Sequence, residues 1–210
     1  MKLAVFGASG GTGRELVRQG LAQGHTITVF VRNPTAFTGH EKLRVVVGDA
    51  RDAQAVAEAI PGQDAVLSAL GGGLGDDSLL PSAMRHILAA MKQNGVRRLI
   101  VLGASGVWPG AARRLPGLAQ VFLRIIESTV LKRPFESQRA MQRLIQVSDV
   151  DWTVVQPPRL LHAPGRGVYH VDGEALPAAG TTIARADVAS FMLAQLTSTE
   201  WVKRSPFVAW

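Results

Sequence analysis

The chain has 210 residues, enough for one buried core and too few for two ordinary domains, and its 47% hydrophobic and 19% charged residues are typical of a folded globular protein. Its 23 Lys and Arg outnumber its 16 Asp and Glu, but the basic residues form isolated pairs without a motif that reads DNA or RNA, so a nucleic-acid partner is not expected. The chain has no cysteine, no apolar run near the ~20 residues that cross a bilayer and no room for a signal peptide, so we expect a cytoplasmic protein without disulfides, thiolate metal sites or a membrane span.

Short apolar runs alternate with longer stretches of helical periodicity along the whole chain. The runs are rich in β-branched residues and bounded by turn residues, which predicts buried strands at 2–6, 26–31, 43–47, 65–69, 98–102 and 152–156. Apolar positions spaced three or four residues apart predict helices at 11–23, 53–59, 80–93, 118–131, 136–146 and 188–196. Asp187 is the expected N-cap of the last of these helices.

This alternation also predicts the fold class. Strands that are apolar on both faces and alternate with helices are typical of a parallel sheet covered on both sides. The expected fold is therefore α/β: a single-domain, doubly wound (Rossmann) sheet over residues 1–210 with helices on both faces. Residues 106–135 and 157–183 are expected to form most of a small lobe on the substrate side.

A glycine-rich segment, Gly7-Ala8-Ser9-Gly10-Gly11-Thr12-Gly13, joins the first predicted strand to the first predicted helix. Glycine permits the sharp turn at 7, a close approach of backbone and diphosphate at 10, and close packing of helix on sheet at 13. Peptide N–H groups of the first helical turn face the diphosphate, and the hydroxyls of Ser9 and Thr12 can add hydrogen bonds. We therefore predict a dinucleotide site that includes Gly11; a tight turn without a ligand is the alternative.

The next two strand ends are predicted to bind the adenosine part of the dinucleotide. Arg32 follows the second strand, where a fold selective for NAD usually carries Asp or Glu. An arginine there can pair with a 2′-phosphate, so NADP(H) is expected to be preferred over NAD(H); a solvated arginine is the alternative. Asp49, which precedes Ala50 after the third strand, either accepts a hydrogen bond from the adenine amino group or caps the next helix.

The later strand ends are predicted to approach the rest of the cofactor. Leu70 and Gly71 follow the fourth strand, where backbone passes close to the ribose and diphosphate, although glycines there can also serve flexibility alone. Gly103 and Ser105 follow the fifth strand. The Ser105 hydroxyl is a candidate to hydrogen-bond the nicotinamide carboxamide or the acceptor, and a polar strand end or helix cap is its alternative role.

Several segments resemble, in order and spacing, the atypical short-chain dehydrogenases, and within them the NAD(P)H-binding flavin reductase and biliverdin-IXβ reductase proteins. The resemblance rests on residues 7–13, 31–34 (Val-Arg-Asn-Pro), 47–49, 62–66, 104–105 (Ala-Ser), 151–158, 185–188 and 191–193, and so runs nearly end to end. It implies NADPH bound across the strand ends, with Ser105 near the nicotinamide. It also implies that Pro157 and Pro158 line the same pocket.

The chain departs from these relatives at two positions. Typical short-chain dehydrogenases protonate a carbonyl oxygen with a tyrosine whose pKa is lowered by a lysine four residues later. Here the one tyrosine is Tyr169, and Gly173 stands four residues on. The flavin and biliverdin reductases tend to carry a histidine after the paired prolines, where this chain has Arg159. The resemblance therefore implies a cofactor but leaves the acceptor open.

These patterns predict an NADPH-dependent reductase that transfers hydride to a small-molecule acceptor: a flavin, a quinone or a similar conjugated compound. Such acceptors take their proton from solvent, so the protein needs only to position donor and acceptor. Trp108 and Arg159 are predicted on the substrate side, where Trp108 stacks on the acceptor ring or serves as packing or a lid. Arg113, Arg114 and Arg159 bind an anionic substrate group or are simply solvated. One alternative is a non-catalytic NAD(P)-sensing regulatory protein resembling the NmrA-like proteins; the other, a nucleotide-sugar epimerase or dehydratase, is disfavoured by the missing tyrosine.

Overall fold

The computed structural model describes residues 1–34, 37, 39–72, 78–107, 132–177 and 180–210. The helix predicted at 118–131 lies outside the described residues, as do Trp108, Arg113 and Arg114. Among the helices of the described ranges, none has the length and hydrophobicity needed to cross a bilayer.

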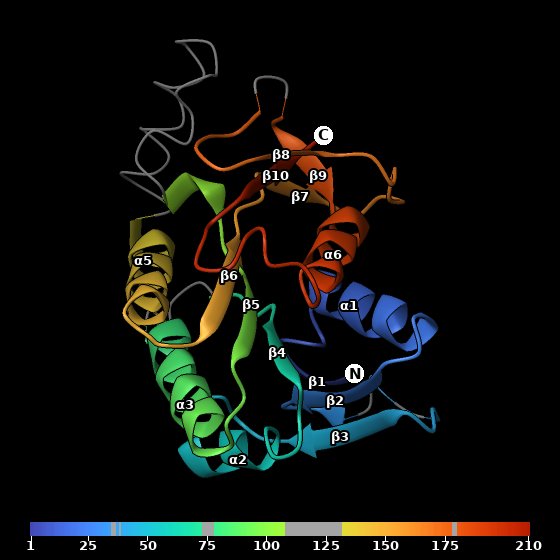
Figure 1. Cartoon of the computed structure of the whole chain (residues 1–210), viewed down its shortest axis with the longest axis vertical. Helices are drawn as coiled ribbons and strands as arrows, with labels where there is room; N and C mark the ends of the chain where they lie inside the picture. Colours follow the sequence, from blue (N-terminus) through green and yellow to red (C-terminus); the bar gives the residue numbers. More distant parts are fainter. Residues whose placement is uncertain (35–36, 38, 73–77, 108–131, 178–179) are drawn as a thin grey trace.

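Six parallel strands form one central sheet in the order β3-β2-β1-β4-β5-β6 (Figure 1). The strands are β1 (Lys2–Phe6), β2 (Thr26–Val31), β3 (Leu43–Val47), β4 (Ala65–Ser68), β5 (Arg98–Leu102) and β6 (Asp151–Val155). The chain runs outward from β1 to β3, then returns beside β1 and runs outward again to β6. The topological switch point therefore lies between β1 and β4, as in a doubly wound Rossmann sheet. The predicted strands and fold class are confirmed, with β4 and β6 differing from their predicted bounds by one residue.

Helices cover both faces of this sheet. They are α1 (Gly11–Ala22), α2 (Ala53–Glu58), α3 (Leu79–Gln93), α5 (Lys132–Gln146) and α6 (Arg185–Ala194). Leu16 of α1 and Met192 of α6 belong to the apolar core on one face, whereas Met84 of α3 and Ile145 of α5 belong to the core on the other. Figure 1 shows α1 and α6 side by side on one side of the sheet. Because α1 and α6 share a face, the start of α6 can reach the glycine loop.

The start of α6 corrects one prediction. The helix begins at Arg185, and Ala184 is its N-cap, so Asp187 is not the cap. Asp187 lies inside the helix, 3% exposed, and its carboxylate accepts hydrogen bonds from the backbone N–H groups of Arg166 and Gly167 and from Nε1 of Trp210. The Asp187 carboxylate is thus hydrogen-bonded to three donors from other segments rather than to the N–H groups at the start of its own helix. Asp187 therefore fixes the 166–167 turn against α6.

Two small sheets lie at the end of the molecule where β5 and β6 end (Figure 1). In one, β7 (Arg159–Leu161) pairs with β9 (Thr182–Ala184), and in the other β8 (His170–Asp172) pairs with β10 (Phe207–Ala209). The segment before β10 also covers the outer edge of β6, since the N–H groups of Val154 and Gln156 donate to Arg204 O and Pro206 O. The edge of the central sheet is thus closed by the chain itself.

Candidate dinucleotide-binding site

The turn between β1 and α1 requires two of its glycines for the fold itself. Gly7 has a φ of +72°, and a Cβ there would lie 2.5 Å from the carbonyl carbon of Ala69, just beyond β4. A Cβ on Gly13 would run into the carbonyl oxygen of Gly7. Both positions are closed by backbone, which cannot shift as a flexible side chain can. These two glycines allow α1 to start directly against the sheet, as the sequence predicts.

Gly10 is a glycine for a different reason. Its φ of −73° and ψ of 166° suit any L-residue, and a Cβ there would meet only Gly7 O, at 3.3 Å. The other side of Gly10 is open, and both Gly10 and Ser9 are exposed. Space at this position is what a bound diphosphate needs.

In the described residues, no carboxylate from the cap or first turn of α1 satisfies the N-terminus of this helix. Its N-cap, Gly10, provides no side-chain hydrogen bond, and its first turn has no acidic residue. Instead Arg14 Nε donates to the Ser9 carbonyl oxygen at 3.0 Å, which brings a cation to the loop. Uncapped N–H groups, the positive end of the helix dipole and a nearby guanidinium together favour an anion. The residues present therefore fit a dinucleotide diphosphate. Ser9 is the exposed hydroxyl of the loop, whereas Thr12 is only 4% exposed.

The predicted adenosine end lies beyond β2 and β3. Arg32 is exposed directly after β2, and its charge contributes to lowering the pKa of Asp49. The main cause of that shift is Arg51, whose Nη2 and Nε lie 2.6 and 3.0 Å from the two Asp49 carboxylate oxygens, and the pKa of Asp49 falls to about 2. Asp49 is therefore ionised at neutral pH, next to two arginines. Ala50, one residue on, is buried.

One of the two alternatives for Asp49 is wrong. The helix after β3 is capped by Asp52, whose Oδ1 accepts from the backbone N–H groups of Gln54 at 2.9 Å and Ala55 at 3.3 Å. Asp49 stands three residues too early to reach those donors and binds Arg51 instead. The adenine role of Asp49 stays a prediction, and an adenine amino group would share a carboxylate that Arg51 already contacts.

The ends of β5 and β6 lie together, as the resemblance implies. The Ser105 N–H donates to Pro157 O at 3.0 Å, and the Gly103 N–H donates to Val155 O at 2.7 Å. Ser105 begins a one-turn 3-10 helix, Ser105–Val107, which Arg139 of α5 holds through a hydrogen bond from Nε to Val107 O at 3.0 Å. The one-turn helix that begins at Ser105 is thus held at both of its ends.

The remaining predicted residues lie around this point. A Cβ on Gly103 would lie 2.7 Å from Gln156 Oε1, so a side chain there would displace the buried side chain of Gln156. Pro157 is buried, Pro158 is half-buried and Arg159 is exposed at the start of β7. Leu70 and Gly71 follow β4, so they lie at the same carboxyl edge of the sheet, and the backbone of Leu70 is next to the turn at Gly7. Contacts of these residues with a cofactor or acceptor stay predictions.

Sequence reasoning missed two side chains at the glycine loop. Arg185 and His162 both approach Gly11, with Arg185 Cδ 2.5 Å and His162 Cε1 3.1 Å from the position of a Cβ on that glycine. The signal for Arg185 was its place in the 185–188 segment of the resemblance. Nothing in the local pattern around His162 marked it.

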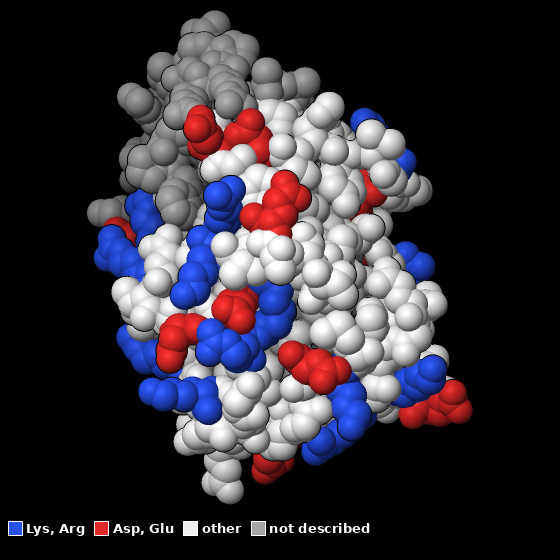
Figure 2. All heavy atoms as spheres, viewed as in Figure 1, with Lys and Arg blue, Asp and Glu red and all other residues white. Residues whose placement is uncertain are grey.

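The basic surface does not single out a nucleic-acid partner. On the face drawn in Figure 2, the Lys and Arg side chains are interspersed with Asp and Glu rather than forming a continuous basic strip. The expectation that nucleic acid is not a partner stays a prediction.

A doubly wound sheet with a glycine loop and an uncapped helix at its β1–α1 turn defines a dinucleotide-binding protein of the Rossmann class. The chain belongs to the NAD(P)H-binding family, whose family model matches residues 7–199. Its relatives include the Bacillus subtilis protein YwnB, 26% identical over 169 residues that make up 79% of this chain and 76% of YwnB. The 2-alkyl-3-oxoalkanoate reductase of Stenotrophomonas maltophilia is 28% identical over 174 residues, which cover 79% of this chain but only 52% of that enzyme.

Solved structures share the fold over almost the whole chain. A short-chain dehydrogenase/reductase from Veillonella parvula in complex with NADP matches with a TM-score of 0.80 at 17% identity, covering 100% of this chain and 94% of that one. ChuY, an anaerobillin reductase from Escherichia coli O157:H7, matches with a TM-score of 0.81 at 20% identity, covering 100% and 97%. At these identities the likeness establishes a common architecture.

Proposed function

We propose that this protein is an NADPH-dependent reductase that transfers hydride to a flavin, a quinone or a similar conjugated acceptor. Membership of the NAD(P)H-binding family supports the cofactor, and the meeting of the β5 and β6 ends supports a site that receives an acceptor beside it. When bound, NADPH supplies the hydride. The chain itself must position the nicotinamide and the acceptor, because the described site offers no tyrosine with a lowered pKa to act as an acid.

The environment of Tyr169 supports the proposal that the acceptor takes its proton from solvent. It is the one tyrosine of the chain, and it packs edge-on against Phe191 of α6, with ring centroids 5.9 Å apart. Burial is the main cause that raises the pKa of Tyr169, with the Asp187 carboxylate a smaller contribution in the same direction. The tyrosine of typical short-chain dehydrogenases needs the opposite shift. An acceptor that takes its proton from solvent is consistent with this site.

The residues of the site then act through orientation. The hydrogen bonds from the Ser105 N–H to Pro157 O and from Arg139 Nε to Val107 O fix the strand ends on which the nicotinamide and acceptor are proposed to rest. Holding two reactants face to face lowers the activation barrier, because the entropy of orienting them is already lost when they bind. The Ser105 hydroxyl is proposed to hydrogen-bond the carboxamide or the acceptor, and the proton of the reduced product comes from solvent.

The test is NADPH oxidation, followed by the loss of absorbance of the reduced nicotinamide, with FMN, riboflavin, menadione and biliverdin as acceptors. Biliverdin is included because ChuY is named an anaerobillin reductase. We expect turnover with at least one of these acceptors and none with a simple aliphatic ketone. Tight NADPH binding without turnover of any acceptor would contradict a reductase and favour the NAD(P)-sensing alternative.

Replacing Ser105 with alanine is expected to lower kcat by roughly tenfold, about 1.4 kcal/mol, which corresponds to one neutral hydrogen bond. The substitution leaves the backbone bond to Pro157 intact, so the melting temperature should change little. Ser198→Ala, at a half-buried serine whose hydroxyl accepts from the Glu200 N–H, is the matched control and should retain full activity. A loss near ten-thousandfold in Ser105→Ala would identify an essential acid or nucleophile and exclude catalysis by positioning alone.

A further inference from the structure

The first residue of α6 lies against the first residue of α1. A Cβ on Gly11 would lie 2.5 Å from Arg185 Cδ and 2.7 Å from Arg185 Nε. Gly11 does not occupy the left-handed region, so the backbone turn does not require glycine there. It is also not one of the three glycines spaced at 7, 10 and 13. The contact that excludes a side chain at Gly11 is therefore the approach of Arg185.

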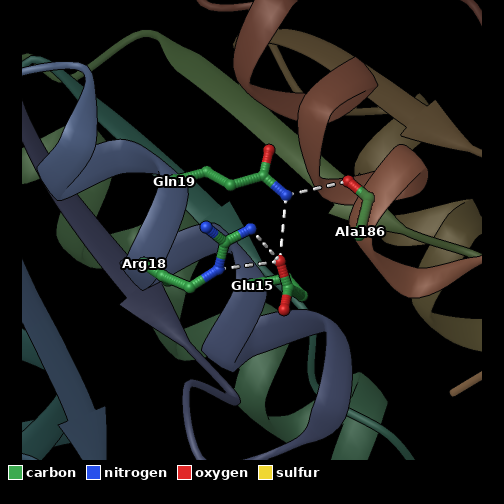
Figure 3. Close-up of polar contacts among 4 residues, drawn as sticks. All are labelled: Glu15, Arg18, Gln19 and Ala186. Atoms are coloured by element: carbon green, nitrogen blue, oxygen red, sulfur yellow. Dashed lines mark hydrogen bonds and ion pairs between the residues drawn. The ribbon is translucent and has the colours of Figure 1, made fainter. Parts of the chain in front are cut away.

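The position of Arg185 is held from several directions. Its Nη1 donates to Leu160 O at 3.2 Å. One residue later, Ala186 O accepts from Gln19 Nε2 at 2.9 Å, and the same Nε2 donates to Glu15 Oε2 at 3.0 Å, which ties the first turn of α6 to the middle of α1 (Figure 3). At the other end of α6, Arg98 donates from Nε and Nη2 to Gln195 O at 3.0 and 2.7 Å. Because α6 is anchored at both ends, Arg185 is presented to the glycine loop by a fixed helix.

No carboxylate in the described residues pairs with Arg185. The acidic residue one turn along α1, Glu15, accepts from Arg18 and Gln19 (Figure 3). Asp187 of α6 is occupied by two backbone N–H groups and the Trp210 indole. Arg185 as a whole residue is only half-buried.

Two arginines and a histidine therefore lie where two helices present their positive ends. Arg185 is the first residue of α6 and lies on the first residue of α1, while Arg14 donates to Ser9 O and His162 flanks Gly11. A cation at a helix N-terminus is destabilising by about 0.3–1 kcal/mol, the reverse of the usual preference. The arrangement becomes favourable when an anion sits between the helix N–H groups and the guanidinium.

We propose that Arg185 binds the diphosphate of the dinucleotide and that Gly11 is a glycine so that Arg185 can reach it. The proposal rests on dinucleotide binding at the glycine loop and adds a contact from the far end of the chain. Arg185 and Arg32 then divide the recognition of the cofactor. Arg185 binds the diphosphate, which NADH and NADPH share, whereas Arg32 binds the 2′-phosphate, which only NADPH carries.

The test compares Arg185→Met with the wild type by titration calorimetry, using NADPH, NADH and ADP-ribose. Loss of a charge-assisted contact to the diphosphate should weaken all three by about 10- to 100-fold and leave the NADPH-to-NADH affinity ratio unchanged. ADP-ribose carries the diphosphate but no nicotinamide, and the titration contains no acceptor. Weaker binding of ADP-ribose therefore shows that the lost contact is not one to the nicotinamide or the acceptor. Arg44→Met, at an exposed arginine of β3, removes the same charge elsewhere and should bind all three like the wild type.

Gly11→Ala provides an independent measurement. Its methyl group displaces the flexible Arg185 side chain rather than the backbone, so the protein should fold and lose affinity in the same direction. In a double-mutant cycle, Gly11→Ala should cost little further affinity in the Arg185→Met background, since both changes remove one contact. If the melting temperature of Arg185→Met lies more than a few degrees below that of the wild type, Arg185→Gln is used in its place, because glutamine keeps a donor for Leu160 O without the charge.

The outcomes are distinct. If the wild type binds NADPH and Arg185→Met or Arg185→Gln binds it equally well, the Arg185 contact is wrong while dinucleotide binding stands. A loss confined to NADPH and absent for NADH would also overturn it, because Arg185 would then read the 2′-phosphate. If the folded wild type binds none of the three ligands, the assignment of the glycine loop itself fails.

Discussion

Replacing Gly10 with valine is expected to abolish binding of NADPH and NADH while leaving the protein folded. The backbone of Gly10 has extended dihedral angles that valine adopts readily, and its Cβ would meet only Gly7 O, at 3.3 Å. The two valine methyl groups then occupy the open side of the loop, which is the side proposed for the diphosphate. We expect a loss of affinity of at least ~100-fold, or ~2.7 kcal/mol, by calorimetry, with a melting temperature within a few degrees of the wild type.

Gly13→Val is the matched control for this prediction. It places the same side chain in the same loop, but its Cβ runs into the Gly7 carbonyl oxygen, so α1 can no longer start against β1. This variant should therefore lose its cooperative unfolding transition or express insolubly. A folded Gly10→Val protein that binds NADPH with wild-type affinity would show that the diphosphate lies elsewhere.

The choice of cofactor is the second large effect, and it is expected to depend on Arg32. NADP presents a 2′-phosphate with close to two negative charges, and an arginine fork can pair with it. Such a pair contributes about 1.5–3 kcal/mol, so the wild type should bind NADPH at least ~10-fold more tightly than NADH at low salt. Because Arg32 is exposed, the preference should narrow as ionic strength rises.

Arg32→Glu should reverse this preference, since a carboxylate repels the phosphate and accepts hydrogen bonds from free ribose hydroxyls. Asp49 adds to the repulsion, because its pKa of about 2 keeps it ionised at neutral pH. Arg32→Gln removes the charge without adding the opposite one and should give nearly equal affinities. Equal dissociation constants for the two cofactors in the wild type would show that Arg32 faces solvent and does not read the 2′-phosphate.

The sequence by itself determined the central sheet and the glycine turn. Apolar runs such as 26–31 are set by local periodicity, which depends only on near neighbours, and the structure has the strand at those residues. The spacing of Gly7, Gly10 and Gly13 is likewise a local property of one strand–turn–helix unit. The repetition of that unit along the chain predicts a parallel sheet, and the preference for right-handed connections restricts the strand orders that such a sheet can take. The positions of the predicted site residues at the strand ends follow from the same repetition.

Only the tertiary structure decided which polar groups meet. Asp52 rather than Asp49 caps α2, because the helix begins where its first N–H groups can reach a carboxylate, and Arg51 holds the other acid. Asp187 lies within α6 because loop and C-terminal donors converge on it. Arg185 reaches Gly11 because α6 packs on α1 on one face of the sheet. Arg185 and Gly11 are so far apart in the chain that their contact leaves no local periodicity, and packing of α6 on α1 is what creates it.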